Sequence, residues 1–156
     1  MFRFRAHVVV HAPPDALAAY VRDLRNITKW DESTRAVRDI DGAGRTWDVE
    51  VDFVPRSTAA CCLCQCLSLG PTRLRYEVGD VETSFNVRTV KMRGASEGIH
   101  TEENYTMRGT GPNTTDLSYE LRVTPRGWRR WLFGACIERR TALLAHAALH
   151  KLAGLF

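Results

Sequence analysis

The chain has 156 residues, of which 44% are hydrophobic and 26% are charged. This length and composition are typical of a globular protein that can bury a core, and we expect a single domain over residues 1–156. The formal net charge of +4 is small, and the arginines alternate with acidic residues, so we expect no nucleic-acid partner.

No stretch approaches the roughly 20 apolar residues that span a bilayer, and the apolar run near the start is too short for a signal-peptide core. Four of the five cysteines lie between Cys61 and Cys66, a spacing unlike the disulfide framework of a secreted domain. We therefore expect a cytoplasmic protein.

The first thirty residues predict one strand and two short helices. Residues 2–11 alternate between apolar and polar side chains, as a half-buried strand does. Pro13 and Pro14 end this strand, and residues 16–24 carry apolar side chains at helical spacing. A second short helix or turn is expected at residues 26–30.

Alternation returns after residue 34 and predicts an antiparallel sheet. Turns that contain glycine or proline separate its strands, and the stretch 94–98 is expected to be a loop. The expected strands cover residues 35–40, 47–53, 57–68, 73–78, 83–92, 99–108 and 115–124.

One long helix is expected after the last strand, because Thr124 can cap it, Pro125 suits its first position and no later proline interrupts it. An apolar stripe on this helix needs a surface to cover. The stripe comprises Ala145, Ala148, Leu149 and Leu152, with Leu144 and Leu155 at its edge. The opposite side carries Arg139, Leu143, His146 and His150.

Four features between residues 7 and 44 follow one another in a recognisable order: the Ala12-Pro13 step, the helical stretch from Ala18 to Asp23, Trp30, and the turn at Gly42 and Gly44. Together with the order of elements, these features resemble the START-like (SRPBCC) superfamily, in particular its polyketide cyclase/dehydrase and lipid-transport branch. The resemblance implies an α+β helix-grip fold, in which a curved antiparallel sheet of about seven strands wraps around the C-terminal helix.

The resemblance also implies an internal cavity, which this superfamily uses for lipid carriage, for sensing, or for aromatase/cyclase chemistry. The alternation of the strands nominates the side chains that would bind a hydrophobic ligand such as a lipid, isoprenoid or polyketide. They are Trp47, Val49, Val51, Phe53, Cys62, Cys64, Tyr76, Phe85, Val87, Tyr105, Met107 and Tyr119.

The same pattern also fits side chains that simply fill a solid core. In that case the protein would be a non-enzymatic interaction module, acting through the strand face at Leu63 and Leu67 or through an arginine-tryptophan patch. The apolar strand face would also suit a homodimer.

Glu103 is the candidate catalytic residue. If residues 99–108 form one strand, its carboxyl shares the cavity face with Tyr105 and Met107, where desolvation raises the pKa of an acid. A bulge or a one-residue shift in register would instead turn Glu103 outward. An inward Glu103 would support aromatase/cyclase or dehydratase activity on a polyketide-like substrate.

Neither a metal nor another cofactor is expected. The clustered cysteines and the pair His146 and His150 lack the three or four ligands that a zinc site needs. The chain also has no nucleophile elbow and no glycine-rich phosphate loop.

Trp128, Arg129, Arg130 and Trp131 form the arginine-tryptophan patch. Such a patch would suit transient contact with an anionic membrane surface. Alternatively, the tryptophans pack beneath the last strand and the arginines are solvated.

Overall fold

The computed structural model describes residues 1–52, 71–127 and 135–156. Within these residues the dominant element is one antiparallel sheet with the strand order β1-β8-β7-β6-β4-β3-β2, and β5 pairs with β6. The strands are β1 (Phe2–Val10), β2 (Thr34–Asp39), β3 (Thr46–Val51), β4 (Thr72–Val78), β5 (Glu82–Ser84), β6 (Val87–Ala95), β7 (Ile99–Gly111) and β8 (Thr114–Pro125).

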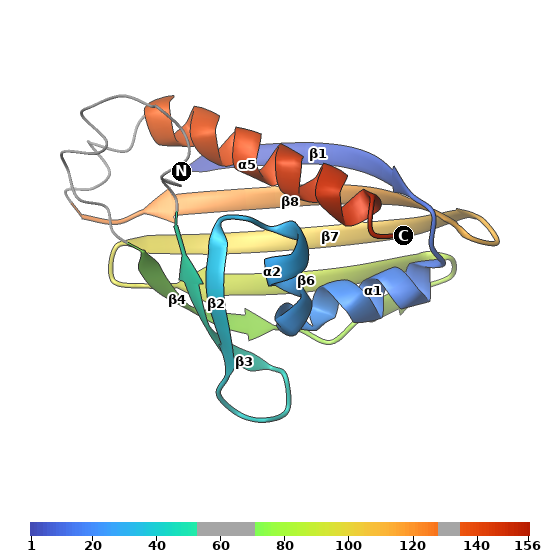
Figure 1. Ribbon diagram of the computed structural model, residues 1–156, viewed down its shortest axis with the longest axis horizontal. Coiled ribbons are helices and arrows are strands. Elements are labelled where there is room, and N and C mark those ends of the chain that lie inside the picture. The colour runs from blue at the N-terminus through green and yellow to red at the C-terminus, as the bar shows by residue number, and fades with distance from the viewer. Residues whose placement is uncertain (53–70, 128–134) are drawn as a thin grey trace.

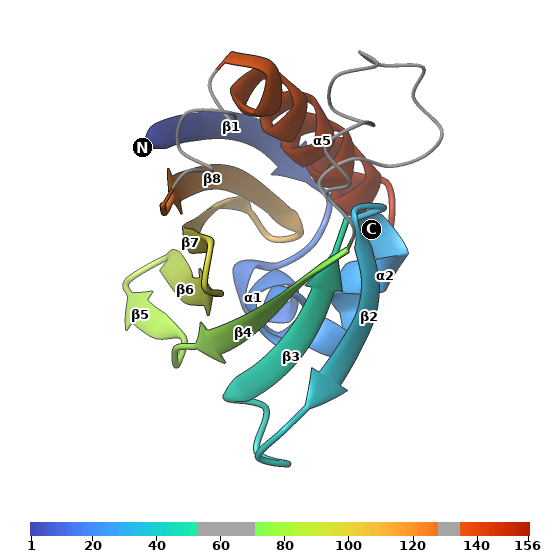
Figure 2. The same ribbon diagram turned by 90° about the vertical axis from the view of Figure 1, so that its left-hand side faces the viewer.

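The helices lie on the inner side of this sheet. They are α1 (Pro14–Arg22), the 3-10 turn η1 (Leu24–Asn26), α2 (Ile27–Trp30) and α5 (Ala135–Ala153). Figure 2 shows the sheet curling from β1 through β8, β7 and β6 to β3 and β2, with α1 and α5 on its concave side. In Figure 1, α5 crosses the strands at one edge of the molecule and α2 lies between it and β3.

Apolar residues fill the space between the sheet and the helices. The stripe of α5 is buried where it faces the sheet, because Ala148, Leu149 and Leu152 are at most 7% exposed. On the opposite side, Leu143 is 65% exposed, and both helix histidines are exposed. The expected orientation of the terminal helix is therefore confirmed, and with it the helix-grip arrangement.

The expected start of the terminal helix is wrong. Thr124 and Pro125 are the last residues of β8, and Gly127 follows with a positive φ of 63°. A proline without an amide hydrogen suits the end of a strand as well as the first turn of a helix, so the local pattern is ambiguous.

The single strand expected at residues 83–92 is instead a hairpin of β5 and β6. Phe85 lies in the turn with a φ of 48°, a value that residues other than glycine rarely adopt. Ser84 pairs with Val87 across this turn. The strand expected at residues 57–68 lies outside the described residues.

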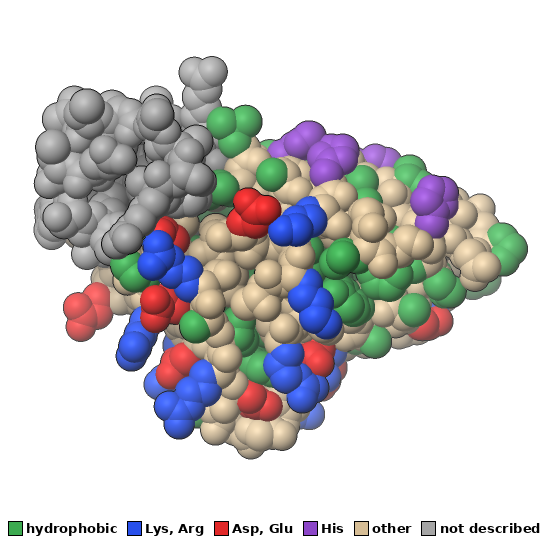
Figure 3. All heavy atoms as spheres, viewed as in Figure 1, with side chains coloured by type: hydrophobic (Ala, Val, Ile, Leu, Met, Phe, Trp, Pro, Cys, Tyr) green, Lys and Arg blue, Asp and Glu red, His purple; other side chains and the backbone are tan. Residues whose placement is uncertain are grey.

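Charges of both signs are interspersed over β2 and β3 in the space-filling view, and histidines gather along the edge formed by α5 (Figure 3). This mixture fits the small net charge of the chain. None of the helices described, whose residues lie within 1–52, 71–127 and 135–156, is long and apolar enough to cross a membrane.

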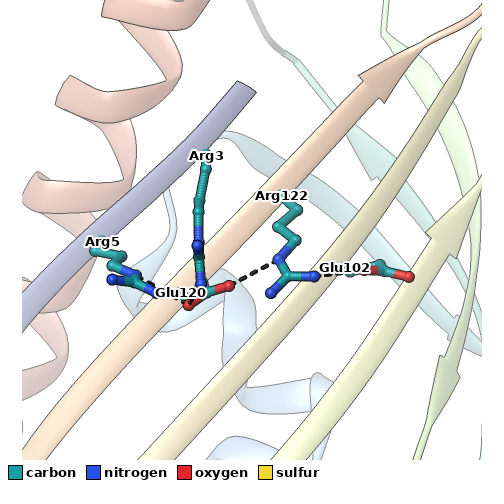
Figure 4. Close-up of polar contacts among 5 residues, drawn as sticks. All are labelled: Arg3, Arg5, Glu102, Glu120 and Arg122. Atoms are coloured by element: carbon teal, nitrogen blue, oxygen red, sulfur yellow. Dashed lines mark hydrogen bonds and ion pairs between the residues drawn. The ribbon is translucent and has the colours of Figure 1, made fainter. Parts of the chain in front are cut away.

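The convex face of the sheet carries an ion-pair network around Glu120 of β8 (Figure 4). Its carboxylate accepts hydrogen bonds from Arg3 at 2.6 Å, Arg5 at 3.0 Å and Arg122 at 2.7 Å. The hydrogen bond from Arg3 contributes most to lowering the pKa of Glu120 to about 2. Because the carboxylate bridges β1 and β8, the network ties the edge strand to the sheet.

We predict that Glu120→Gln lowers the free energy of unfolding by about 1 kcal/mol at pH 7. The folded pKa lies below the unfolded value of about 4.3, so this stabilisation is complete above pH 4.3 and is lost as the pH falls towards 2. Urea denaturation at several pH values measures it. Glu82→Gln, which removes a carboxylate paired with the single residue Lys91 among those described, is the control. The prediction would be contradicted if the difference in unfolding free energy between wild type and Glu120→Gln stayed constant down to pH 2.

Candidate functional site

A cavity of about 70 Å³ lies between the concave face of the sheet and the helices α2 and α5. Most of its wall is apolar, and the polar side chains come from the strands of the sheet, from the segment after α2 and from α5. The lining residues are Ile27, Trp30, Asp31, Ser33, Thr34, Val49, Val51, Tyr76, Thr101, Glu103, Tyr105, Tyr119, Leu121, Val123, Thr141, Leu144, Ala145, Ala148 and Leu149.

The carboxyl group of Glu103 is the point at which several polar side chains of the sheet meet. It is only 8% exposed, and three tyrosine hydroxyls donate hydrogen bonds to it. Tyr76 donates to Oε1 at 2.8 Å, whereas Tyr105 and Tyr119 donate to Oε2 at 2.7 Å and 3.0 Å. The hydroxyl of Thr101 in turn donates to the Tyr76 oxygen at 3.3 Å. We call Glu103 and these three tyrosines the carboxylate-tyrosine cluster.

The strand register explains how these side chains meet. Tyr105 follows Glu103 by two positions on β7 and therefore shares its face. Tyr105 is paired with Tyr119 of β8, and their rings lie 4.7 Å apart between centroids. The inward direction of Glu103 is therefore set by the unbroken alternation of β7.

Tyr76 reaches the same point from β4, which is separated from β7 by β6. It is paired with Gly94 of β6, where a Cβ atom would lie only 2.8 Å from the tyrosine ring. The absence of a side chain at Gly94 therefore gives the Tyr76 ring room to cross β6 and to direct its hydroxyl at Glu103.

Burial raises the pKa of Glu103 above its usual value. Hydrogen bonds from Tyr105, Tyr76 and Tyr119 oppose this increase, and the negative charge of Asp31 adds to it. Burial, followed by the charge of Glu103, raises the pKa of each tyrosine hydroxyl well above its usual value. The three hydroxyls thus stay protonated and remain hydrogen-bond donors. The carboxyl of Glu103 is the group of this cluster that can gain or lose a proton.

A second polar group follows α2. Asp31 accepts hydrogen bonds from the amide and hydroxyl of Ser33 and from the hydroxyl of Thr34, at 2.7 to 2.9 Å. Trp30 lies edge-on to Tyr105, with centroids 6.3 Å apart. Its buried indole N–H has no hydrogen-bond partner among the residues described.

The structure brings some of the predicted ligand-binding residues together at the cavity and separates others from it. Val49, Val51, Tyr76, Tyr105 and Tyr119 line it, as does the predicted catalytic residue Glu103. Trp47 and Met107 are buried in the core but are not among the lining residues.

Phe85 and Val87 do not reach the cavity. Phe85 is 94% exposed at the tip of the β5–β6 hairpin, because the turn removes it from the alternating face. Val87 begins β6 on the far side of that turn. Phe53, Cys62, Cys64 and the arginine-tryptophan patch lie outside the described residues.

Trp30, Asp31, Ser33 and Thr34 are site residues that strand alternation does not nominate, because they lie in and after a short helix. Trp30 does stand in the stretch that carries the family resemblance. The two α5 histidines approach each other at 3.3 Å between Nε2 atoms. No group of three or more His, Cys, Asp or Glu that could hold a metal occurs within the part of the chain described here.

Comparison with families of known sequence gives one match over the whole chain. The model of the family described as "Polyketide cyclase / dehydrase and lipid transport" matches residues 1–156. No curated protein matches the sequence.

Solved structures with little sequence similarity share the fold. A START superfamily protein from Mycobacterium smegmatis superposes with a TM-score of 0.70 at 14% identity, covering 98% of this chain and 95% of its own. The human StarD13 lipid transfer and protein localization domain superposes with a TM-score of 0.64 at 15% identity, and the match covers 99% of this chain and 76% of that domain's chain. The di-domain ARO/CYC BexL from the BE-7585A biosynthetic pathway superposes with a TM-score of 0.66 at 12% identity, and the match covers 99% of this chain and 46% of the BexL chain.

We predict that the Glu103 carboxyl titrates above its ordinary value of about 4.3, and that Tyr105→Phe moves the midpoint higher still because one hydrogen bond to the carboxylate is lost. Carbon-detected NMR of the glutamate side chains measures both midpoints, with Glu103→Gln identifying the resonance. Tyr20→Phe, which removes a hydroxyl from α1 outside the cavity, serves as the control and leaves the midpoint unchanged. A midpoint at or below 4.3 in the wild type would contradict burial as the dominant effect.

Proposed function

The chain belongs to the polyketide cyclase/dehydrase and lipid transport family, and on that premise we propose that it binds a hydrophobic small molecule between the sheet and α5. The carboxylate-tyrosine cluster is the observation that carries the proposal. A solid core has no need of a buried carboxylate, whose desolvation is costly. A ligand site, by contrast, combines an apolar wall with a few polar groups that fix orientation.

In this proposal the apolar side chains of the cavity provide most of the affinity for the ligand. Leu121 and Val123 of the sheet face Leu144, Ala145 and Leu149 of α5 across the cavity. Burial of apolar ligand surface against such groups contributes about 25 cal/mol per Å². These side chains have no polar atoms, so they favour ligands by size and shape alone.

In the same proposal the polar side chains of the cavity orient the ligand. Glu103 accepts hydrogen bonds, and the tyrosine oxygens retain lone pairs after donating to it. The indole N–H of Trp30, which has no partner among the residues described, is a further donor in the same wall. A ligand with one polar end therefore has one preferred direction in the cavity.

The volume of the cavity limits how much of a ligand the described residues can enclose. A cavity of about 70 Å³ is less than half of the roughly 150 Å³ in which an engineered protein cavity binds benzene. It has room for a small polar head group, and a longer ligand needs more room than the described residues leave. Because α5 forms one wall, its displacement from the sheet would enlarge the site.

The proposals on location and partners rest on the sequence. The cysteine spacing supports a cytoplasmic protein. Transient membrane contact through the arginine-tryptophan patch and homodimer formation through the strand face at Leu63 and Leu67 stay predictions.

Native mass spectrometry of the protein purified from its own host, followed by organic extraction, tests the binding function. We expect a discrete co-purifying hydrophobe, and Ala145→Phe, which fills the cavity from α5, should reduce its occupancy at least tenfold. Overpacking of this kind costs about 1–3 kcal/mol of stability, so His146→Phe on the exposed side of the same helix is the matched control. A ligand-free wild type that takes up no lipid or aromatic polyketide would overturn the proposal.

Turnover is a second candidate function, and the buried ionisable carboxyl of Glu103 favours it. A carboxyl with a raised pKa, surrounded by hydroxyls that hold it in place, is suited to accept and return a proton. In an aromatase/cyclase or dehydratase, the cavity would hold a bent polyketide-like chain while Glu103 moved the proton.

If the protein catalyses such a reaction, we predict that Glu103→Gln lowers the turnover number about 10²- to 10⁴-fold while the ligand still binds. Liquid chromatography of the products formed from a poly-β-ketone substrate provides the measurement. Glu102→Gln, one residue away on the opposite face of β7, is the control and retains activity. Equal rates for wild type and Glu103→Gln would remove Glu103 as the acid/base group.

A further inference from the structure

The charged groups that line the cavity are all acidic. Among the described lining residues, Glu103 and Asp31 carry carboxyl groups, and none is lysine, arginine or histidine. The ion pairs of the described residues do not include either carboxylate. Two carboxyl groups therefore share one cavity, and no basic side chain contacts either of them among the residues described.

Two basic side chains on elements that border the cavity are paired elsewhere. Arg35 binds Asp52, and Lys151 of α5 binds Glu32 at 3.0 Å on the surface. Glu32 and Asp31 are adjacent in sequence, yet only Asp31 lines the cavity. The acidic character of the cavity is therefore not neutralised by these two basic side chains.

Aromatic residues surround the same carboxylates. Trp30, Tyr76, Tyr105 and Tyr119 all line the cavity, and no more than 7% of any of them is exposed. A cation is attracted to the face of an aromatic ring, most strongly where water is excluded. Hydrogen bonds from neutral hydroxyls stabilise the ionised form of Glu103 but bring no positive charge to it.

We propose that the ligand carries a cationic amine at its polar end and that this amine binds between the carboxylates of Glu103 and Asp31. The inference rests on the binding function proposed above and adds the charge of the ligand to it. An ammonium group is small enough for the described cavity. It also donates hydrogen bonds, which both carboxylates accept.

This arrangement couples amine binding to the proton of Glu103. The groups that face its carboxyl are Asp31 from the segment after α2, Tyr76 from β4, Tyr105 from β7 and Tyr119 from β8. The tyrosine hydroxyls stay protonated near neutral pH because their pKa values are raised, so the carboxyl of Glu103 is the group of this cluster that changes charge. Binding of a cation favours the ionised form of Glu103 and releases any proton that it holds.

Isothermal titration calorimetry of the full chain with octylamine, 1-octanol and octanoate separates the effect of the ligand's charge from that of its hydrophobicity, because the three probes have chains of the same length. At pH 7 we expect octylamine to bind about tenfold more tightly than 1-octanol, and octanoate most weakly. An alkylamine stays protonated between pH 4 and 8. Its affinity should therefore rise with pH as the Glu103 carboxyl ionises, whereas that of 1-octanol should not.

Asp31→Asn tests the second carboxylate without touching the carboxylate-tyrosine cluster. It should weaken octylamine several-fold and leave 1-octanol unchanged, while Glu32→Gln, the same loss of charge at the adjacent surface position, should affect neither. If 1-octanol binds as tightly as octylamine, the charge assignment fails and the binding function stands. If none of the three probes binds and no hydrophobe co-purifies, the binding function itself fails.

Discussion

The burial of one carboxyl group constrains the site more than any other feature. Glu103 points into the space between sheet and helix, where an unpaired charge would be costly. Three phenol hydroxyls from three strands compensate part of that cost. The positions of Tyr76, Tyr105 and Tyr119 follow from this requirement, and so does the glycine at position 94 that admits the Tyr76 ring. The apolar stripe of α5 then closes the cavity over them.

The pKa values of the carboxyl groups on the two faces of the sheet are shifted in opposite directions. On the convex face, three arginines lower the pKa of Glu120 to about 2, so that this group is a fixed anion with a structural role. On the concave face, burial raises the pKa of Glu103, and no arginine contacts it among the residues described. A carboxyl kept apart from basic side chains is free to respond to a ligand or to a proton, which is the property that the proposed functions use.

Most of the fold follows from alternation and helical spacing, because each depends on neighbouring residues only. The sequence leaves two directions open for Glu103, and the structure shows the inward one because the irregularity of β7 lies between Gly109 and Gly111, beyond the cluster. The hairpin at Phe85 could not be predicted, because a phenylalanine with positive φ gives no local turn signal. The meeting of Tyr76 with Glu103 depends on the packing of β4 across β6, and the role of Asp31 depends on the position of α2. Both are tertiary contacts that no short stretch of sequence encodes.

The central claim is that the polar end of a hydrophobic ligand binds at the carboxylate-tyrosine cluster. A crystal structure of the protein with its extracted ligand or with octylamine tests this most directly. The account predicts a polar atom of the ligand within hydrogen-bond distance of Glu103 or of one of the three tyrosine hydroxyls, with the apolar part against α5. A ligand bound only on the convex face, with the Glu103 cavity unchanged, would contradict it.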